Sequence, residues 1–91
     1  MSTVRSAADE LVLAEQCDAL GAHDDAINAL ARATKLGDVE ATTRLGKRLI
    51  VGDKAPLLPT DGAGFLIDAV NRGGAEAAAR LAVLAAAGVY V

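Results

Sequence analysis

Apolar residues recur at intervals of three and four along most of the chain, which is the spacing of one face of an α-helix. Leu30 and Ala33 lie three residues apart, and Ala41 and Leu45 lie four apart. Glycine or proline interrupts this pattern several times, and each interruption marks a helix end or a connection. The pattern predicts five helices, over residues 6–20, 24–36, 39–51, 61–72 and 75–87.

Residues with capping chemistry stand near the predicted helix starts. Ser6 and Asp9 have the spacing of a capping box for the first helix, and Asp38 is the predicted N-cap of the third. In the connection 52–60, two prolines forbid helix continuation, and Thr60 is the predicted N-cap of the fourth helix. The other connections are short, and short connections make consecutive helices pack antiparallel.

The sequence contains an internal repeat with a period of 36 residues. Residues 25–52 align without gaps onto residues 61–88, with nine of 28 positions identical. One identical pair, Gly37 and Gly73, follows the first helix of each unit, where glycine adopts the left-handed conformation that ends a helix. Repeats of this size stack into solenoids, in which each unit packs on its neighbours.

The composition agrees with a helical repeat. Hydrophobic residues make up 53% of the 91 residues and aromatic residues only 2%, with 21 alanines and 12 leucines. Alanine and leucine lead the helix propensity scale, so an all-β fold is excluded. The sequence predicts one all-α domain over residues 1–91, a right-handed α-solenoid fragment of five antiparallel helices: hairpins over about 6–36 and 39–72, and a half hairpin over 75–87.

Charge and cysteine content narrow the possible partners and the compartment. The net charge of −3 argues against a nucleic-acid footprint of clustered lysine and arginine. Cys17 is the single cysteine, so the chain forms no internal disulfide, and a cytoplasmic location is expected. The longest uncharged stretch, 81–91, is shorter than the roughly 20 residues that span a bilayer, so no membrane partner is expected.

The spacing of small and apolar residues in the repeat resembles that of a known family. The matching residues are Ala26, Leu30, Ala33, Gly37, Ala41, Leu45, Gly46, Leu49 and Gly52, then Pro59 and Asp61 in a loop, then Leu66, Ala69, Gly73, Ala77, Leu81, Ala82 and Gly88. This pattern resembles Sel-one-like repeats of the tetratricopeptide superfamily, and the N-terminal third resembles an ordinary tetratricopeptide hairpin. The chain departs from the family at Leu49 and Leu66, where aromatic residues are common, and at Ala82, where a glycine is common.

Side chains able to do catalysis are scarce: one histidine, two serines, one tyrosine and one cysteine. We expect Cys17 to be a buried structural residue and His23 a solvated turn residue, with no second histidine or cysteine spaced to share a metal. Gly46 lies within a predicted helix, where glycine is unfavourable, so a close approach of the paired helix is expected. The sequence therefore predicts a non-enzymatic chain without cofactor or metal.

In the superfamily that the chain resembles, the first helix of each hairpin lines a concave groove that holds a partner protein or peptide. The positions implicated in this way, together with a basic cluster on the third helix, are Leu11, Glu15, Asp18, Glu40, Thr43, Arg44, Lys47, Arg48, Ile50, Glu76, Ala79 and Val83. The basic cluster, Arg44 with Lys47 and Arg48, is interpreted either as a solvated helix face or as a site for an acidic group.

Three functions are compatible with this pattern. The leading hypothesis is a non-catalytic module for protein or peptide binding, forming the N-terminal segment of a larger protein. The first alternative is an accessory region of a bacterial iron/2-oxoglutarate oxygenase of the prolyl-hydroxylase type, which would present the substrate or dimerise the enzyme. The second alternative is a stand-alone homo-oligomeric scaffold. Helix 75–87 is apolar almost all round after Arg80, so a C-terminal domain of the same chain or a second copy is expected to cover it.

Overall fold

The computed structural model describes residues 6–86, and within them the chain forms five α-helices and no strand. The helices are α1 (Ala7–Ala19), α2 (His23–Lys35), α3 (Val39–Val51), α4 (Pro59–Asn71) and α5 (Ala75–Ala86). The prediction of an all-helical chain is confirmed, and every described boundary lies within two residues of the predicted one. The predicted last residue of the fifth helix, 87, lies outside the described residues.

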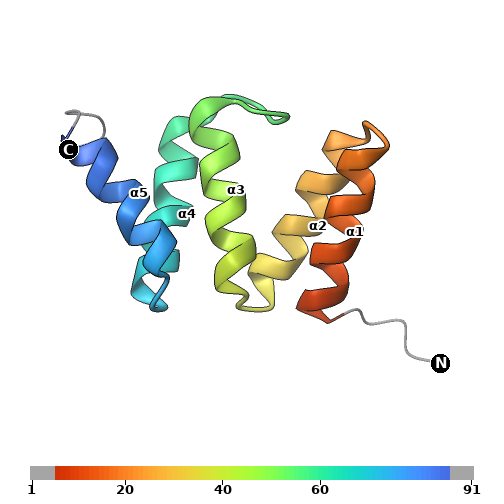
Figure 1. The fold of residues 1–91 in the computed structure, drawn as a ribbon, viewed down its shortest axis with the longest axis horizontal. Coiled ribbons are helices and arrows are strands. Elements are labelled where there is room, and N and C mark those ends of the chain that lie inside the picture. The colour runs from red at the N-terminus through yellow and green to blue at the C-terminus, as the bar shows by residue number, and fades with distance from the viewer. Residues whose placement is uncertain (1–5, 87–91) are drawn as a thin grey trace.

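The helices lie side by side in chain order, from α1 at one end of the molecule to α5 at the other (Figure 1). The main contacts join consecutive helices, and they are more extensive within the pairs α1–α2 and α3–α4 than between α2 and α3 or between α4 and α5. The molecule is correspondingly elongated, with extents of 48 × 27 × 16 Å. Helix α5 therefore packs mainly on α4.

Two of the predicted helix starts are confirmed by their hydrogen bonds. The side-chain oxygen of Ser6 accepts from the Asp9 amide at 3.1 Å, and the Asp9 carboxylate accepts from the Ser6 amide at 3.2 Å, which is a capping box. Asp38 caps α3 by accepting from the Ala41 amide at 2.8 Å. The preceding residue, Gly37, has a φ of 88°, which is the left-handed conformation expected from the sequence.

Two other predictions near helix starts are wrong. Helix α4 begins at Pro59 rather than after Thr60, and its N-cap, Leu58, makes no side-chain cap. Proline suits the first helical position because its φ is already helical and the missing N–H would have no partner there. His23 is not a solvated turn residue but the first residue of α2, and its Nδ1 lies 2.8 Å from Asp18 Oδ1.

The core is built almost entirely from alanine and leucine, in two clusters. The larger contains Ala14, Ala26, Ala29, Leu30, Ala33, Ala41, Leu45 and Leu49, and the smaller contains Leu66, Ala69 and Ala77. Cys17 is half-buried rather than fully buried and packs against the larger cluster. Small side chains let the helix axes approach closely, so a chain with few aromatic residues can still exclude water between neighbouring helices.

Helices α3 and α4 approach each other closely where two glycines face each other. A Cβ added to Gly46 would lie 2.8 Å from the carbonyl oxygen of Gly62, and a Cβ on Gly62 would lie 2.7 Å from that of Gly46. The close approach predicted for Gly46 is confirmed. Helix α3 also buries two threonines, whose hydroxyls donate hydrogen bonds to backbone carbonyls one turn earlier: Thr42 to Asp38 at 2.8 Å and Thr43 to Val39 at 2.9 Å.

Candidate functional site

A pocket of about 410 Å³ opens along the side of the molecule formed by α1, α3 and α5. Its lining combines charged side chains with an apolar floor, and the even-numbered helices contribute one leucine each. The lining residues are Ala14, Glu15, Asp18, Leu30, Arg44, Lys47, Arg48, Ile50, Val51, Asp53, Leu66, Arg80, Val83 and Leu84. Residues from three helices that are far apart in the sequence thus share one concave surface.

Seven of the twelve residues predicted for a partner groove line this pocket: Glu15, Asp18, Arg44, Lys47, Arg48, Ile50 and Val83. The other five do not. Leu11 packs against the core, and Ala79 is exposed on α5. Glu40 and Glu76 lie beside the pocket, where each is ion-paired with one of its basic residues. Thr43 is a correction: it is only 2% exposed, so its side chain is not available to a partner.

The basic cluster on α3 is neither a simple solvated face nor a free site, because each of its residues is already paired with a carboxylate. Arg44 lies 2.7 Å from Glu40 on its own helix and 3.3 Å from Glu15 on α1. Lys47 lies 2.7 Å from Glu76 on α5. The hydrogen bond from Lys47 lowers the pKa of Glu76. These pairs link α3 to α1 on one side and to α5 on the other.

The most extensive ion pair of the pocket joins Arg48 to Asp18. Two guanidinium nitrogens of Arg48 donate to the two carboxylate oxygens of Asp18, at 2.7 and 3.0 Å, and one of them also donates to the Lys54 carbonyl at 2.8 Å. Asp18 also lies 2.8 Å from His23 Nδ1. The hydrogen bond from Arg48 lowers the pKa of Asp18; burial opposes this shift, and the contact with His23 adds to it. The Asp18 carboxylate therefore connects α1 to α2 and α3, and the Arg48 guanidinium extends the connection to the loop after α3.

Two charged side chains of the pocket, those of Arg80 on α5 and Asp53 in the loop after α3, form no hydrogen bond or ion pair within residues 6–86. The sequence interpretation did not select either of them. A signal for Arg80 was present, because Arg80 is identical to Arg44 in the 36-residue repeat. The pocket thus contains four cations, of which three are already paired.

The uncharged part of the pocket is aliphatic. Ile50 and Leu84 are half-buried against the smaller core cluster, and Leu66 is fully buried beneath them. Val51 and Val83 are 69% and 66% exposed, and both line the pocket. An apolar surface with charged groups beside it is the usual composition of a ligand site.

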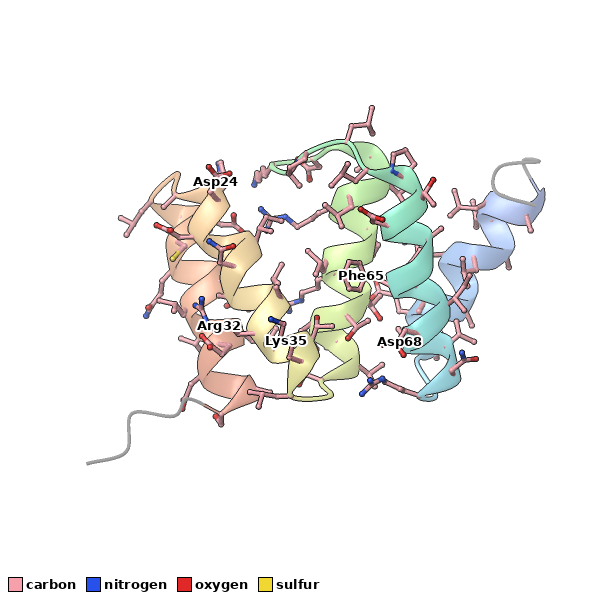
Figure 2. All side chains as sticks on the ribbon, turned by 180° about the vertical axis from the view of Figure 1, so that it is seen from behind. Asp24, Arg32, Lys35, Phe65 and Asp68 are labelled. Carbon is pink, nitrogen blue, oxygen red and sulfur yellow. The ribbon has the colours of Figure 1, made fainter. Side chains whose placement is uncertain are left out.

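The opposite side of the molecule shows α2 and α4, with Asp24, Arg32, Lys35, Phe65 and Asp68 labelled (Figure 2). There the Nε of Arg32 donates to the buried carboxylate of Glu10 at 2.6 Å, and this hydrogen bond raises the pKa of Arg32. The contact ties α2 to α1. None of these residues lines the pocket.

Among residues 6–86, no three histidine, cysteine, aspartate or glutamate side chains gather in a way that could hold a metal ion. No helix in the same range has the length and apolar character needed to cross a membrane. Comparison with known proteins gave no match: no family model, no curated protein and no solved structure matches this chain.

Proposed function

We propose that the chain is a non-catalytic helical-repeat module that binds a peptide segment of a protein partner in the pocket between α1, α3 and α5. The observation that carries the proposal is the pocket itself: side chains from all three odd-numbered helices line one concave, partly aliphatic surface. Exposed apolar side chains beside charged ones favour a polypeptide ligand, because peptides offer apolar and charged side chains at short spacing.

The proposal includes a finer description of the fold, a right-handed α-solenoid fragment of antiparallel hairpins that resembles the tetratricopeptide and Sel-one-like repeats. Three observations support it. The strongest contacts fall within the pairs α1–α2 and α3–α4. The repeated glycines Gly37 and Gly73 both have positive φ at the end of a helix. The repeated residues Leu30 and Leu66 are both 1% exposed, as equivalent core positions of successive units should be.

The first test is selection of peptides from a random library displayed on phage, with residues 1–91 as the immobilised target. Selected peptides are then titrated against the chain, against Val83→Gln and against Ile67→Gln, with fluorescence anisotropy as the readout. Val83 lines the pocket, whereas Ile67 is a comparably exposed β-branched residue of α4 that does not.

We expect Val83→Gln to weaken binding by about fivefold or more, because it removes part of an aliphatic contact. Ile67→Gln should bind as the unchanged chain does. Equal affinity of all three proteins would place the bound peptide elsewhere, and a library that gives no binder would count against the function altogether.

One further observation favours a second function, a homo-oligomeric scaffold held together through α5. The residues Ala78, Ala82 and Ala85 are exposed, whereas their counterparts one repeat earlier, Thr42, Gly46 and Leu49, are buried in α3. Sedimentation velocity across a concentration series tests this function: a dimer that Ala82→Glu dissociates supports it, and a monomer at every concentration opposes it. The oxygenase accessory stays a prediction, because its iron ligands would lie outside residues 1–91.

A further inference from the structure

Building on the proposed peptide-binding function, we propose that the pocket selects a segment with one acidic side chain between aliphatic side chains, and that the carboxylate pairs with Arg80. The partner is thus a stretch of polypeptide in which a single aspartate or glutamate interrupts an apolar sequence. The inference depends on which charges of the pocket the chain itself neutralises.

The internal repeat gives a direct comparison for Arg80. Its counterpart Arg44 is neutralised by two carboxylates, Glu40 four residues earlier on α3 and Glu15 on α1. The counterpart of Glu40 is Glu76, four residues before Arg80. An equivalent ion pair within α5 would therefore be expected from the sequence.

The structure shows a different pairing. Lys47 of α3 forms an ion pair with Glu76, with 2.7 Å between Nζ and Oε2. The Arg80 side chain has no carboxylate partner among residues 6–86. The Arg80 charge is nevertheless close enough to contribute to the lowered pKa of Glu76. The Glu76 carboxylate beside the pocket thus has Lys47 at hydrogen-bond distance, with Arg80 and Arg44 further away. A second carboxylate, supplied by a ligand, would satisfy Arg80 without breaking an existing ion pair.

The surroundings of Arg80 favour an aliphatic segment around that carboxylate. Val83 and Leu84 lie three and four residues after Arg80, so they share its side of α5, and both line the pocket. Ile50 and Val51 of α3 add aliphatic surface to the same pocket. A carboxylate bound at Arg80 therefore brings its neighbouring side chains against aliphatic groups.

The remaining unpaired charge limits the number of acidic residues. Asp53 lines the pocket from the loop after α3 and has no cationic partner in the described part of the chain. A second carboxylate near this loop would be repelled by Asp53. We therefore expect a single acidic residue to be preferred over a run of acidic residues.

The test uses four pools of acetylated and amidated pentapeptides, so that only side chains carry charge. The central residue is Asp, Asn or Lys in three pools, and the outer positions are drawn from Leu, Val, Ala and Ser. In the fourth pool all five positions are Asp or Glu. Each pool is titrated into ¹⁵N-labelled residues 1–91, and the affinity is taken from the shifts of the amide resonances of the pocket residues.

We expect the Asp pool to bind about two- to fivefold more tightly than the Asn pool, the range of an exposed ion pair. The Lys and all-acidic pools should bind more weakly than the Asp pool. Arg80→Gln should remove the preference of Asp over Asn. Lys35→Gln removes one positive charge from the face shown in Figure 2, outside the pocket, and should keep that preference.

The outcomes separate this inference from the proposed function. Equal binding of the Asp and Asn pools, weakened by Val83→Gln, would overturn the acidic preference and leave the peptide-binding function in place. A preference that survives in Arg80→Gln would also overturn it. Binding of no pool, together with failure of the phage selection, would count against both. Circular dichroism melting of each variant checks that the fold is intact, which we expect because Arg80 and Lys35 are exposed.

Discussion

Adding a single methyl group to Gly46 tests whether α3 and α4 are as close as the structure shows. In an isolated helix, Gly→Ala is stabilising by about 1 kcal/mol, because alanine loses less backbone entropy and has the best helix propensity. In this protein the new Cβ would lie 2.8 Å from the carbonyl oxygen of Gly62 and 3.0 Å from two carbon atoms of Leu66. The nearest atom belongs to the backbone, so α4 must move away.

The net effect follows from two opposing terms. Overpacking of a close contact costs about 1–3 kcal/mol, and the propensity gain offsets about 1 kcal/mol of it. We therefore expect Gly46→Ala to lower the free energy of unfolding by as much as about 2 kcal/mol. For a domain of this size, each kcal/mol corresponds to roughly 4–8 °C in Tm.

Gly64 is the matched control. It lies within α4, and a Cβ added there would meet no atom within 4 Å. Gly64→Ala therefore has the propensity gain without the clash and should raise the free energy of unfolding by about 0.5–1 kcal/mol. Urea unfolding followed by circular dichroism at the helix band measures both variants. The expected result is a change of opposite sign in the two proteins, and stabilisation by both would refute the close contact between α3 and α4.

Two further predictions concern the cap of α3 and the ion pairs of the pocket. Asp38→Ala removes the hydrogen bond from the Ala41 amide and should lower the free energy of unfolding by about 1 kcal/mol, whereas Asp38→Asn should retain most of the stability that this cap adds. Equal urea midpoints for Asp38→Ala and the unchanged chain would contradict the capping role. The pKa values of Asp18 and Glu76 are lowered in the folded state, mainly by hydrogen bonds from Arg48 and Lys47. The two ion pairs therefore stabilise the folded state fully above the unfolded pKa of about 4, and this stabilisation is lost as the pH falls through the folded-state pKa values. Tm should therefore fall on acidification in this window, and less steeply in Asp18→Asn; parallel curves for the two proteins would contradict the ion pair.

Much of the fold could be predicted because local spacing determines helices. The three- and four-residue intervals of alanine and leucine, the Ser6 and Asp38 caps and the left-handed glycines act over a few residues, so they are visible in the sequence alone. The predicted start of α4 is wrong because Pro59 and Thr60 both suit a helix start, and the packing of the preceding loop decides at which of them the helix begins. The 36-residue repeat also identified Leu30 and Leu66 as equivalent positions, and both are buried.

The sequence by itself determined five helices, their approximate ends, the alanine and leucine core and the need for a close helix approach at Gly46. Only the tertiary structure decided which charges neutralise each other. Arg44 and Arg80 have the same sequence neighbours at the positions four residues before them, yet Glu40 stays with Arg44 while Glu76 pairs with Lys47 of another helix. Helix periodicity specifies which side chains share a face, but an ion pair depends on distances between helices, and those are set by how closely the helices pack.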